Sequence, residues 1–180
     1  MSTLYELPWG AGKPGLQSGF WSQVLGGWQI GGILTLRSGQ PFTAQLNPNT
    51  NGTGKNAQGR LDVIRNPNLP SDQRTPDRWF DTRAFVPPPT FTDARGSFSI
   101  PGNEGRDILD GPGLKNFDMT LQKLIRTGER HSLTFRSEFF NLTNHPNFDV
   151  PGRQIGTGSF GKVSSAKSPR LIQFSLRYAF

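Results

Sequence analysis

Hydrophobic positions along this chain recur with a period of two residues. In the last ten residues, LIQFSLRYAF, alternate positions carry Ile172, Phe174, Leu176, Tyr178 and Phe180, and the positions between them are mostly polar. Such alternation is typical of a β-strand that has one apolar face and one polar face. The pattern therefore predicts a strand over 170–180.

Four other segments repeat this pattern. Together they predict strands over about 2–8, 24–37, 114–126, 131–142 and 170–180. Two residues break the alternation within 114–126, because Lys123 and Leu124 each fall on the wrong side. Most of these strands would be about 10–14 residues long, whereas strands of soluble proteins usually have about 5–6 residues. A transmembrane β-strand needs about 9–11, so length and alternation both indicate a membrane barrel.

The links between the strands differ greatly in length. Thr127–Arg130 is short enough for a tight hairpin, whereas 38–113 and 143–169 are long and rich in Gly, Pro and polar residues. Outer-membrane barrels alternate short periplasmic turns with long extracellular loops. We predict an all-β fold whose antiparallel up-and-down strands form part of a transmembrane outer-membrane β-barrel, with 38–113 and 143–169 as extracellular loops. A small hairpin is expected near 96–100.

The alternation also assigns residues to the two faces of the predicted wall. The polar side chains expected to line the lumen are Arg37, Gln122, Arg126, Arg136, Glu138 and Arg177. The aromatic side chains expected to face lipid or its interface are Trp28, Phe135, Phe139, Tyr178 and Phe180.

Composition narrows the classes of function. The net charge is +7, from 20 Lys and Arg against 13 Asp and Glu, but no three basic residues are consecutive. We therefore predict no nucleic-acid partner. The chain has no Cys, which excludes disulfides and thiolate metal sites, and its two His belong to no ligand-spaced cluster. We expect neither a metal nor a cofactor.

Two glycine-containing stretches resemble phosphate-binding loops. GTGSFGKV at 156–163 has the G-x-G-x-x-G spacing, but neither H-R-D nor D-F-G occurs in the chain. NTNGTGKN at 49–56 has Asn where a P-loop has its first Gly, and Asn56 where it has Ser or Thr. Both stretches are therefore predicted to be turns or loops, the first with glycines at positive φ.

Paired acidic residues are the remaining candidates for chemistry. Asp107 with Asp110, and Asp77 with Asp81, lie in segments rich in Arg, where ion pairs and turns account for them. No catalytic constellation is found, and we expect the chain not to be an enzyme.

Several longer motifs resemble one family. They are VLGGWQIGGILTLRSGQPFT (24–43), GRDILDGPGLKNFDMTLQK (105–123), RHSLTFRSEFFNLTNHPNF (130–148) and IGTGSFGKVSSAKSPRLIQFSLRYAF (155–180). These motifs resemble the C-terminal barrel segment of TonB-dependent receptors of the Oar-like type. The alternate residues that end in Phe180 also resemble the C-terminal signature read by the barrel assembly machinery; they are Ile172, Phe174, Leu176, Tyr178 and Phe180.

The resemblance implies a place and a role. It implies a wall segment of a TonB-dependent transporter that takes up a substrate across the bacterial outer membrane. The implied partners are outer-membrane lipid, the barrel assembly machinery, the remainder of the parent barrel with its plug, and TonB through the parent protein. The family also carries a signal peptide and a plug, which are not found here, and its barrels have about 22 strands. We therefore expect residues 1–180 to be a C-terminal fragment that is not functional alone.

Other interpretations fit the same strands. One is a non-transport outer-membrane barrel, such as an adhesin or a structural protein, and another is a soluble β-sandwich binding module. Any substrate contact is expected in 38–113, where Trp79, Phe80, Phe85 and Phe91 lie among several Arg. The alternative for these four aromatic residues is packing within the loop or on neighbouring loops.

Overall fold

The structure is a computed structural model that describes residues 1–180 except 11–12, 16–17, 47–58, 95 and 127–130. The chain forms two compact units, which we name the sheet unit and the loop unit. The sheet unit comprises Met1–Arg37, Leu114–Asn147 and Ser168–Phe180. The loop unit comprises Ser38–Gly113 and Phe148–Lys167.

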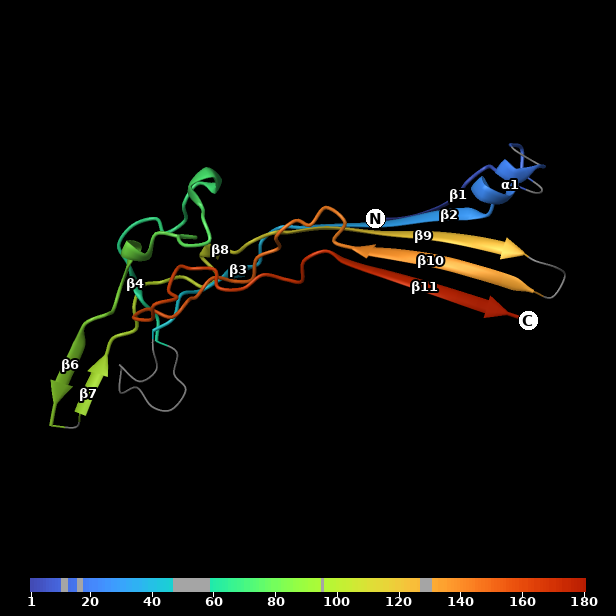
Figure 1. Cartoon of the computed structure of the whole chain (residues 1–180). Coiled ribbons are helices and arrows are strands. Elements are labelled where there is room, and N and C mark those ends of the chain that lie inside the picture. Colours follow the sequence, from blue (N-terminus) through green and yellow to red (C-terminus); the bar gives the residue numbers. More distant parts are fainter. Residues whose placement is uncertain (11–12, 16–17, 47–58, 95, 127–130) are drawn as a thin grey trace. The chain divides into compact units, whose positions relative to one another are not determined.

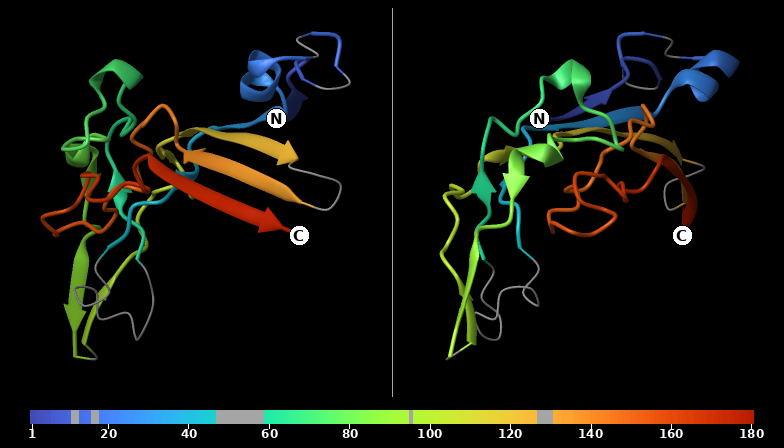
Figure 2. Two further views of the ribbon diagram at one scale, coloured as in Figure 1. Left: turned by 45° about the vertical axis from the view of Figure 1, so that its right-hand side comes forward. Right: turned by 90° about the vertical axis from the view of Figure 1, so that its left-hand side faces the viewer.

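The sheet unit is built on one antiparallel sheet with strand order β1-β2-β9-β10-β11 (Figure 1). The strands are β1 (Ser2–Glu6), β2 (Trp28–Arg37), β9 (Leu114–Arg126), β10 (Ser132–Phe140) and β11 (Leu171–Ala179). The sheet is seen from two further directions in Figure 2, where β11, in red, lies at one edge beside β10. Within the described residues, no helix is long and apolar enough to cross a membrane.

The five strands lie within the five segments predicted from alternation, and β9 has the predicted bounds of 114–126. The predicted strand over 24–37 begins later, because helix α1 (Phe20–Leu25) occupies its first residues. Gly27 adopts φ +74°, and a Cβ there would lie 2.5 Å from the Leu124 carbonyl oxygen. Only glycine fits this turn comfortably, so the chain enters β2 at Trp28.

The end of β10 also differs from the prediction of 131–142. Asn141 takes a positive φ of 49°, which breaks the extended conformation directly after Phe140. Its side chain accepts the His145 amide at 3.0 Å and donates to the His145 carbonyl at 3.0 Å. A side chain that forms hydrogen bonds with nearby backbone groups favours a turn, so the strand does not continue through Asn141. The hairpin predicted at 127–130 lies outside the described residues.

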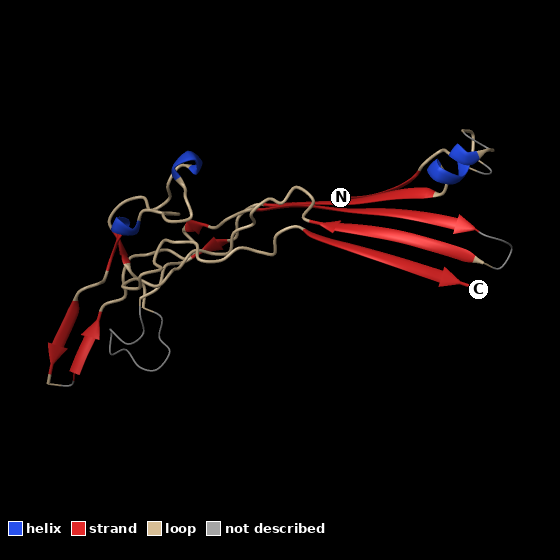
Figure 3. Cartoon of the chain, viewed as in Figure 1, coloured by secondary structure: helices blue, strands red, loops and turns tan. Residues whose placement is uncertain are grey.

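In the part of the loop unit that the structure describes, the elements are all short (Figure 3). Its strand pairs are β3 (Pro41–Phe42) with β8 (Leu109–Asp110), β4 (Asp62–Val63) with β5 (Phe85–Val86), and β6 (Thr90–Asp93) with β7 (Gly96–Ser99). The 3-10 helices η2 (Ser71–Gln73) and η3 (Thr82–Ala84) accompany them. The β6–β7 pair is the hairpin predicted near 96–100, and that prediction is confirmed.

A hydrophobic core holds the loop unit together. Its buried members are Phe42, Ala44, Leu46, Leu61, Phe80, Ala84, Phe85 and Leu109. Ile155 and Phe160, which belong to the second predicted loop, pack against this core. The two predicted loops are thus not separate irregular excursions, because apolar residues from both are buried together.

Candidate membrane-facing and interior-facing surfaces

One face of the five-stranded sheet is apolar. Phe135 of β10 lies opposite Leu176 of β11, and Phe139 lies opposite both Met119 and Ile172. Directly opposite residues share a face, so the register gathers the apolar positions on one side. This apolar face consists of Trp28, Ile30, Leu34, Leu36, Phe117, Met119, Leu121, Ile125, Leu133, Phe135, Phe139, Ile172, Phe174, Leu176 and Tyr178.

The apolar face is largely uncovered in this chain. Phe174 and Leu176 are each 67% exposed, and Leu36 is 65% exposed. An exposed apolar surface that extends over several strands marks a contact with protein or membrane.

The opposite face of the sheet is polar. Gln29, Gln122, Arg136 and Ser175 lie in one cross-strand row of this face. Arg136 pairs with Glu138 at 2.6 Å, so two polar positions of the same strand neutralise each other. A concave region of about 500 Å³ lies against Gln29, Gln122 and Arg136. The six residues predicted to line a lumen all lie on this face: Arg37, Gln122, Arg126, Arg136, Glu138 and Arg177.

Lys123, which breaks the alternation, has its charge satisfied locally. It lies on the apolar face, opposite Trp28 and Phe135. Its ammonium group donates to the carbonyls of Gln23 at 2.6 Å and Val24 at 2.5 Å, near the C-terminal end of α1. It also lies 5.2 Å from the centroid of the Trp28 ring, in a cation–π contact. Lys123 thus joins α1 to the sheet.

The C-terminal residues form an aromatic cluster at the end of β11. Phe180 stacks on Tyr178 with ring centroids 5.9 Å apart, and Tyr178 stacks on His131 at the same separation. The Tyr178 hydroxyl also forms a hydrogen bond with His131 Nδ1 at 2.8 Å. Ile172, Phe174, Leu176 and Tyr178 share the apolar face, as their alternation in the sequence predicted.

The structure corrects part of the predicted substrate-contact set in the loop unit. Phe80 is 1% exposed and Phe85 4% exposed, and both rings pack edge-on against Phe160. These two residues belong to the core, because burying their rings removes a large apolar area from water. Of the two interpretations given for Phe80 and Phe85, packing within the loops is confirmed, and substrate contact through exposed rings is not. Phe91 is 45% exposed, as a surface contact would require.

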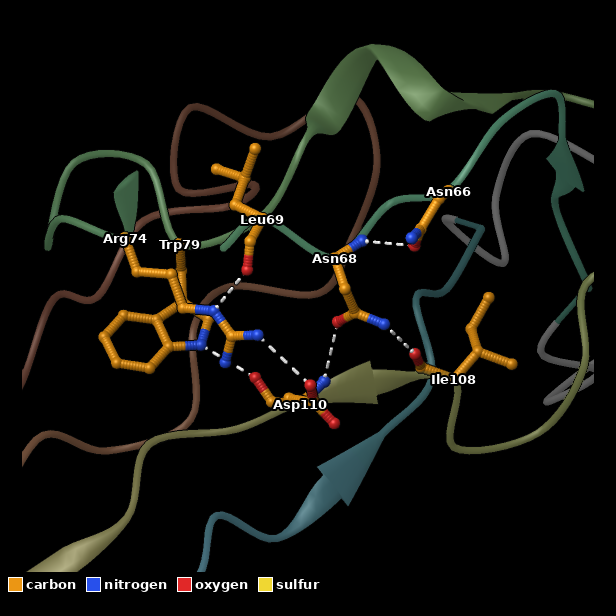
Figure 4. Close-up of polar contacts among 7 residues, drawn as sticks. All are labelled: Asn66, Asn68, Leu69, Arg74, Trp79, Ile108 and Asp110. Carbon is orange, nitrogen blue, oxygen red and sulfur yellow. Dashed lines mark hydrogen bonds and ion pairs between the residues drawn. The ribbon is translucent and has the colours of Figure 1, made fainter. Parts of the chain in front are cut away.

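Trp79, the fourth predicted contact, is half-buried and held in a polar network (Figure 4). Its indole N–H donates to the Asp110 carbonyl at 2.8 Å, and its ring packs against Phe148. Asn68 accepts the Asp110 amide at 3.0 Å and donates to the Ile108 carbonyl at 2.6 Å. These bonds join Asn68 and Trp79 to 108–110, so Trp79 has a structural role here.

One member of each acidic pair considered for catalysis, Asp110 and Asp81, forms an ion pair with an arginine. Arg74 lies 3.1 Å from Asp110, and Arg65 lies 2.8 Å from Asp81. Burial raises the pKa of Asp81, but hydrogen bonds from Arg65 and the Arg83 amide, with the charges of Arg65 and Arg78, outweigh it and hold the pKa below its ordinary value. In the part of the chain that the structure describes, no group of three or more His, Cys, Asp or Glu could hold a metal ion.

The glycine motif at 156–163 forms a turn. This was predicted because the other sequence motifs of a kinase, H-R-D and D-F-G, do not occur in the chain. Gly156 and Gly161 have φ values of +81° and +79°. Between them, Phe160 turns its ring into the core. Sequence reasoning gave this motif no role in packing, because a single aromatic residue among glycines has no periodic pattern.

A family model for an outer membrane beta barrel domain matches residues 1–173. The chain belongs to this family of outer membrane beta barrel domains. A search of curated proteins and a search of solved structures each found no significant match. The family places the chain in the bacterial outer membrane, and the antiparallel sheet agrees with an all-β barrel fold.

Membership of the family explains why the sheet has two unlike faces. An outer-membrane barrel turns an apolar band outward to lipid and polar side chains toward its interior. The sheet unit has one face of each kind, and β9, with 13 residues, is long enough to span the hydrocarbon.

Proposed function

We propose that this chain supplies wall strands and external loops of a TonB-dependent transporter that takes up a substrate across the outer membrane. The motifs at 24–43, 105–123 and 130–148 support the transporter type through their resemblance to Oar-like receptors. In this proposal the apolar face contacts lipid and the polar face lines the interior beside a plug. The chain has no enzymatic activity and binds no nucleic acid.

The observation that carries the proposal is the connectivity of the loop unit. Arg37 pairs with Leu114, and Phe140 pairs with Leu171, so Ser38–Gly113 and Phe148–Lys167 are both inserted at one end of the sheet. Long insertions at one end, set against a short link between β9 and β10, match the extracellular loops of a barrel. Loops that share a buried core present a shaped surface, which substrate capture requires.

The sheet implies further wall strands. β1 and β11 each pair with one neighbour among the described residues. An unpaired strand edge is strongly unfavourable in hydrocarbon, because its N–H and C=O groups have no water to bind. We propose that the remainder of the parent barrel pairs with both edges, and that the barrel assembly machinery recognises the segment ending at Phe180.

Growth of three strains tests the proposal. The wild type, a strain without the gene and a strain without TonB are grown on a panel of defined oligosaccharides and ferric chelates. We expect the gene deletion to abolish growth on a subset of the nutrients that the TonB deletion abolishes. If the gene deletion leaves every nutrient usable but abolishes surface attachment, the transporter proposal is wrong and an adhesin is favoured.

A further inference from the structure

A pocket of about 830 Å³ lies within the loop unit. This volume is within the range of about 300–1,000 Å³ that small-molecule sites occupy. Its walls come from four separate stretches of the chain, 40–45, 59–60, 106–107 and 150–153. The Gln45 amide donates to the Arg153 carbonyl at 2.7 Å, which holds the first and last of these stretches together.

Three arginines line this pocket: Arg60, Arg106 and Arg153. None of them forms an ion pair with a carboxylate within the described residues. Elsewhere in the loop unit, Arg65 and Arg74 pair with Asp81 and Asp110. The pocket therefore keeps guanidinium groups that the fold does not neutralise directly.

Two carboxylates lie near these arginines, and both are engaged by the chain. Asp107 lines the pocket, where its carboxylate accepts the Thr43 hydroxyl at 3.2 Å while Thr43 Oγ1 accepts the Asp107 amide at 2.7 Å. Glu104 is 1% exposed, and its two oxygens accept the Ala44 and Leu61 amides. Burial raises the pKa of Glu104, and the charge of Arg60 opposes that rise, so Arg60 acts partly on this buried group. Three guanidinium groups against two carboxylates leave an excess of positive charge around the pocket.

The rest of the lining suits a hydroxylated ligand. Gln40 provides a side-chain amide, and Pro41 and Val150 provide apolar surface. Guanidinium groups bind carboxylate and phosphate oxygens through paired N–H donors. We propose that this pocket binds an anionic sugar, whose carboxylate or phosphate contacts Arg60, Arg106 and Arg153. The inference deepens the proposed function by naming a substrate class, and only its biological meaning rests on that function.

Three sugars that differ only at C6 test this proposal. Galactose carries a hydroxyl there, galacturonate a carboxylate and galactose 6-phosphate a phosphate. Binding is measured by titration calorimetry on the full chain in detergent micelles, with folding of each sample checked by a cooperative thermal transition. We expect at least one of the two anionic sugars to bind about tenfold or more tightly than galactose, with affinity that falls as salt rises. The better anion identifies whether the site prefers carboxylate or phosphate.

Variants locate the binding. We expect Arg106→Gln and Arg153→Gln each to weaken binding of the anionic sugar about tenfold, because each loses a charged hydrogen bond. Arg106→Lys should recover part of the affinity, since it keeps the charge but loses the paired donors. Arg83→Gln is the matched control, because Arg83 is an exposed arginine of the same unit outside the pocket.

The inference is overturned if all three sugars bind equally, if neither anion binds at millimolar concentration, or if the pocket variants bind as Arg83→Gln does. Failure of the proposed function has a different signature. In that case the anionic sugar binds the purified protein normally, while the gene deletion leaves all TonB-dependent growth intact.

Discussion

The carboxylate of Glu104 accepts the amide N–H of Ala44 at 2.9 Å, although sixty residues separate the two in sequence. Its second oxygen accepts the Leu61 amide at 3.3 Å. Both amides belong to residues of the buried core, where an unpaired N–H is costly. One buried side chain thus completes the backbone hydrogen bonding of two distant segments of the loop unit.

We predict that Glu104→Ala destabilises the loop unit by about 3 kcal/mol, because it leaves two buried amides without an acceptor. Hydrogen exchange followed by mass spectrometry should show roughly hundredfold faster exchange at Ala44 and Leu61. Asp72→Ala, an exposed acidic position in η2, is the matched control and should exchange as the wild type does. Unchanged exchange in Glu104→Ala would show that water replaces the carboxylate at no cost.

Two carboxyl groups, those of Glu104 and Asp81, should make the stability of the loop unit depend on pH, and their contributions change in opposite directions as pH rises. Burial raises the pKa of Glu104 above its ordinary value of 4.5, although the two amide hydrogen bonds and Arg60 oppose this. The folded state then holds the proton more tightly, so the contribution of Glu104 is greatest below pH 4.5 and is lost as pH rises through its folded pKa. The pKa of Asp81 is lowered from 3.8, so its contribution is present above pH 3.8 and is lost as pH falls through its folded pKa.

Urea unfolding of the loop unit at a series of pH values measures how its free energy of unfolding changes with pH, and so checks the direction of both contributions. We expect Glu104 and Asp81 together to give the free energy of unfolding a maximum near pH 4, with a decline on either side. Glu104→Gln should remove the decline at higher pH, and Asp81→Asn the decline at lower pH. A Glu104→Gln curve parallel to that of the wild type above pH 4.5 would contradict the assignment of the high-pH decline to Glu104.

Alternation made the strands predictable, whereas the loop unit lacked any comparable signal. In β11 every second residue is apolar. Pairing with β10 aligns the apolar positions of the two strands, and each strand shows these positions in its own sequence. The core residues Phe80 and Leu109 each belong to an apolar pair between charged residues, Trp79-Phe80 and Ile108-Leu109, and so short a stretch has no period that marks one member as buried. Their partners are chosen by long-range packing, and this is why the sequence left Phe80 with two interpretations, substrate contact or packing within the loops.

Lys123 is a residue within a strand whose contacts the sequence pattern likewise could not predict. Its position on the apolar face contradicts the alternation, and its partners lie about a hundred residues away in α1. We predict that Lys123→Met, which keeps much of the side-chain volume, frees α1 from the sheet and increases hydrogen exchange at 20–25. Lys115→Met is the control, because Lys115 lies on the same face of β9 away from α1. Equal exchange in both variants would show that the Trp28–Val24 hydrogen bond alone holds α1.

Neighbouring residues in β11 test the orientation of the two faces toward lipid. Phe174 lies on the apolar face and Ser175 on the polar face, in the same strand and at the same depth. An arginine on the lipid face of a barrel costs about 2–4 kcal/mol near the bilayer midplane, whereas the interior tolerates charge. We therefore expect Phe174→Arg to reduce the amount of folded protein in the outer membrane strongly, and Ser175→Arg to leave it near the wild-type amount. The measurement is the fraction of heat-modifiable protein in isolated outer membranes. Equal losses would place both side chains in similar surroundings, and a loss confined to Ser175→Arg would mean that the polar face, rather than the apolar face, meets lipid.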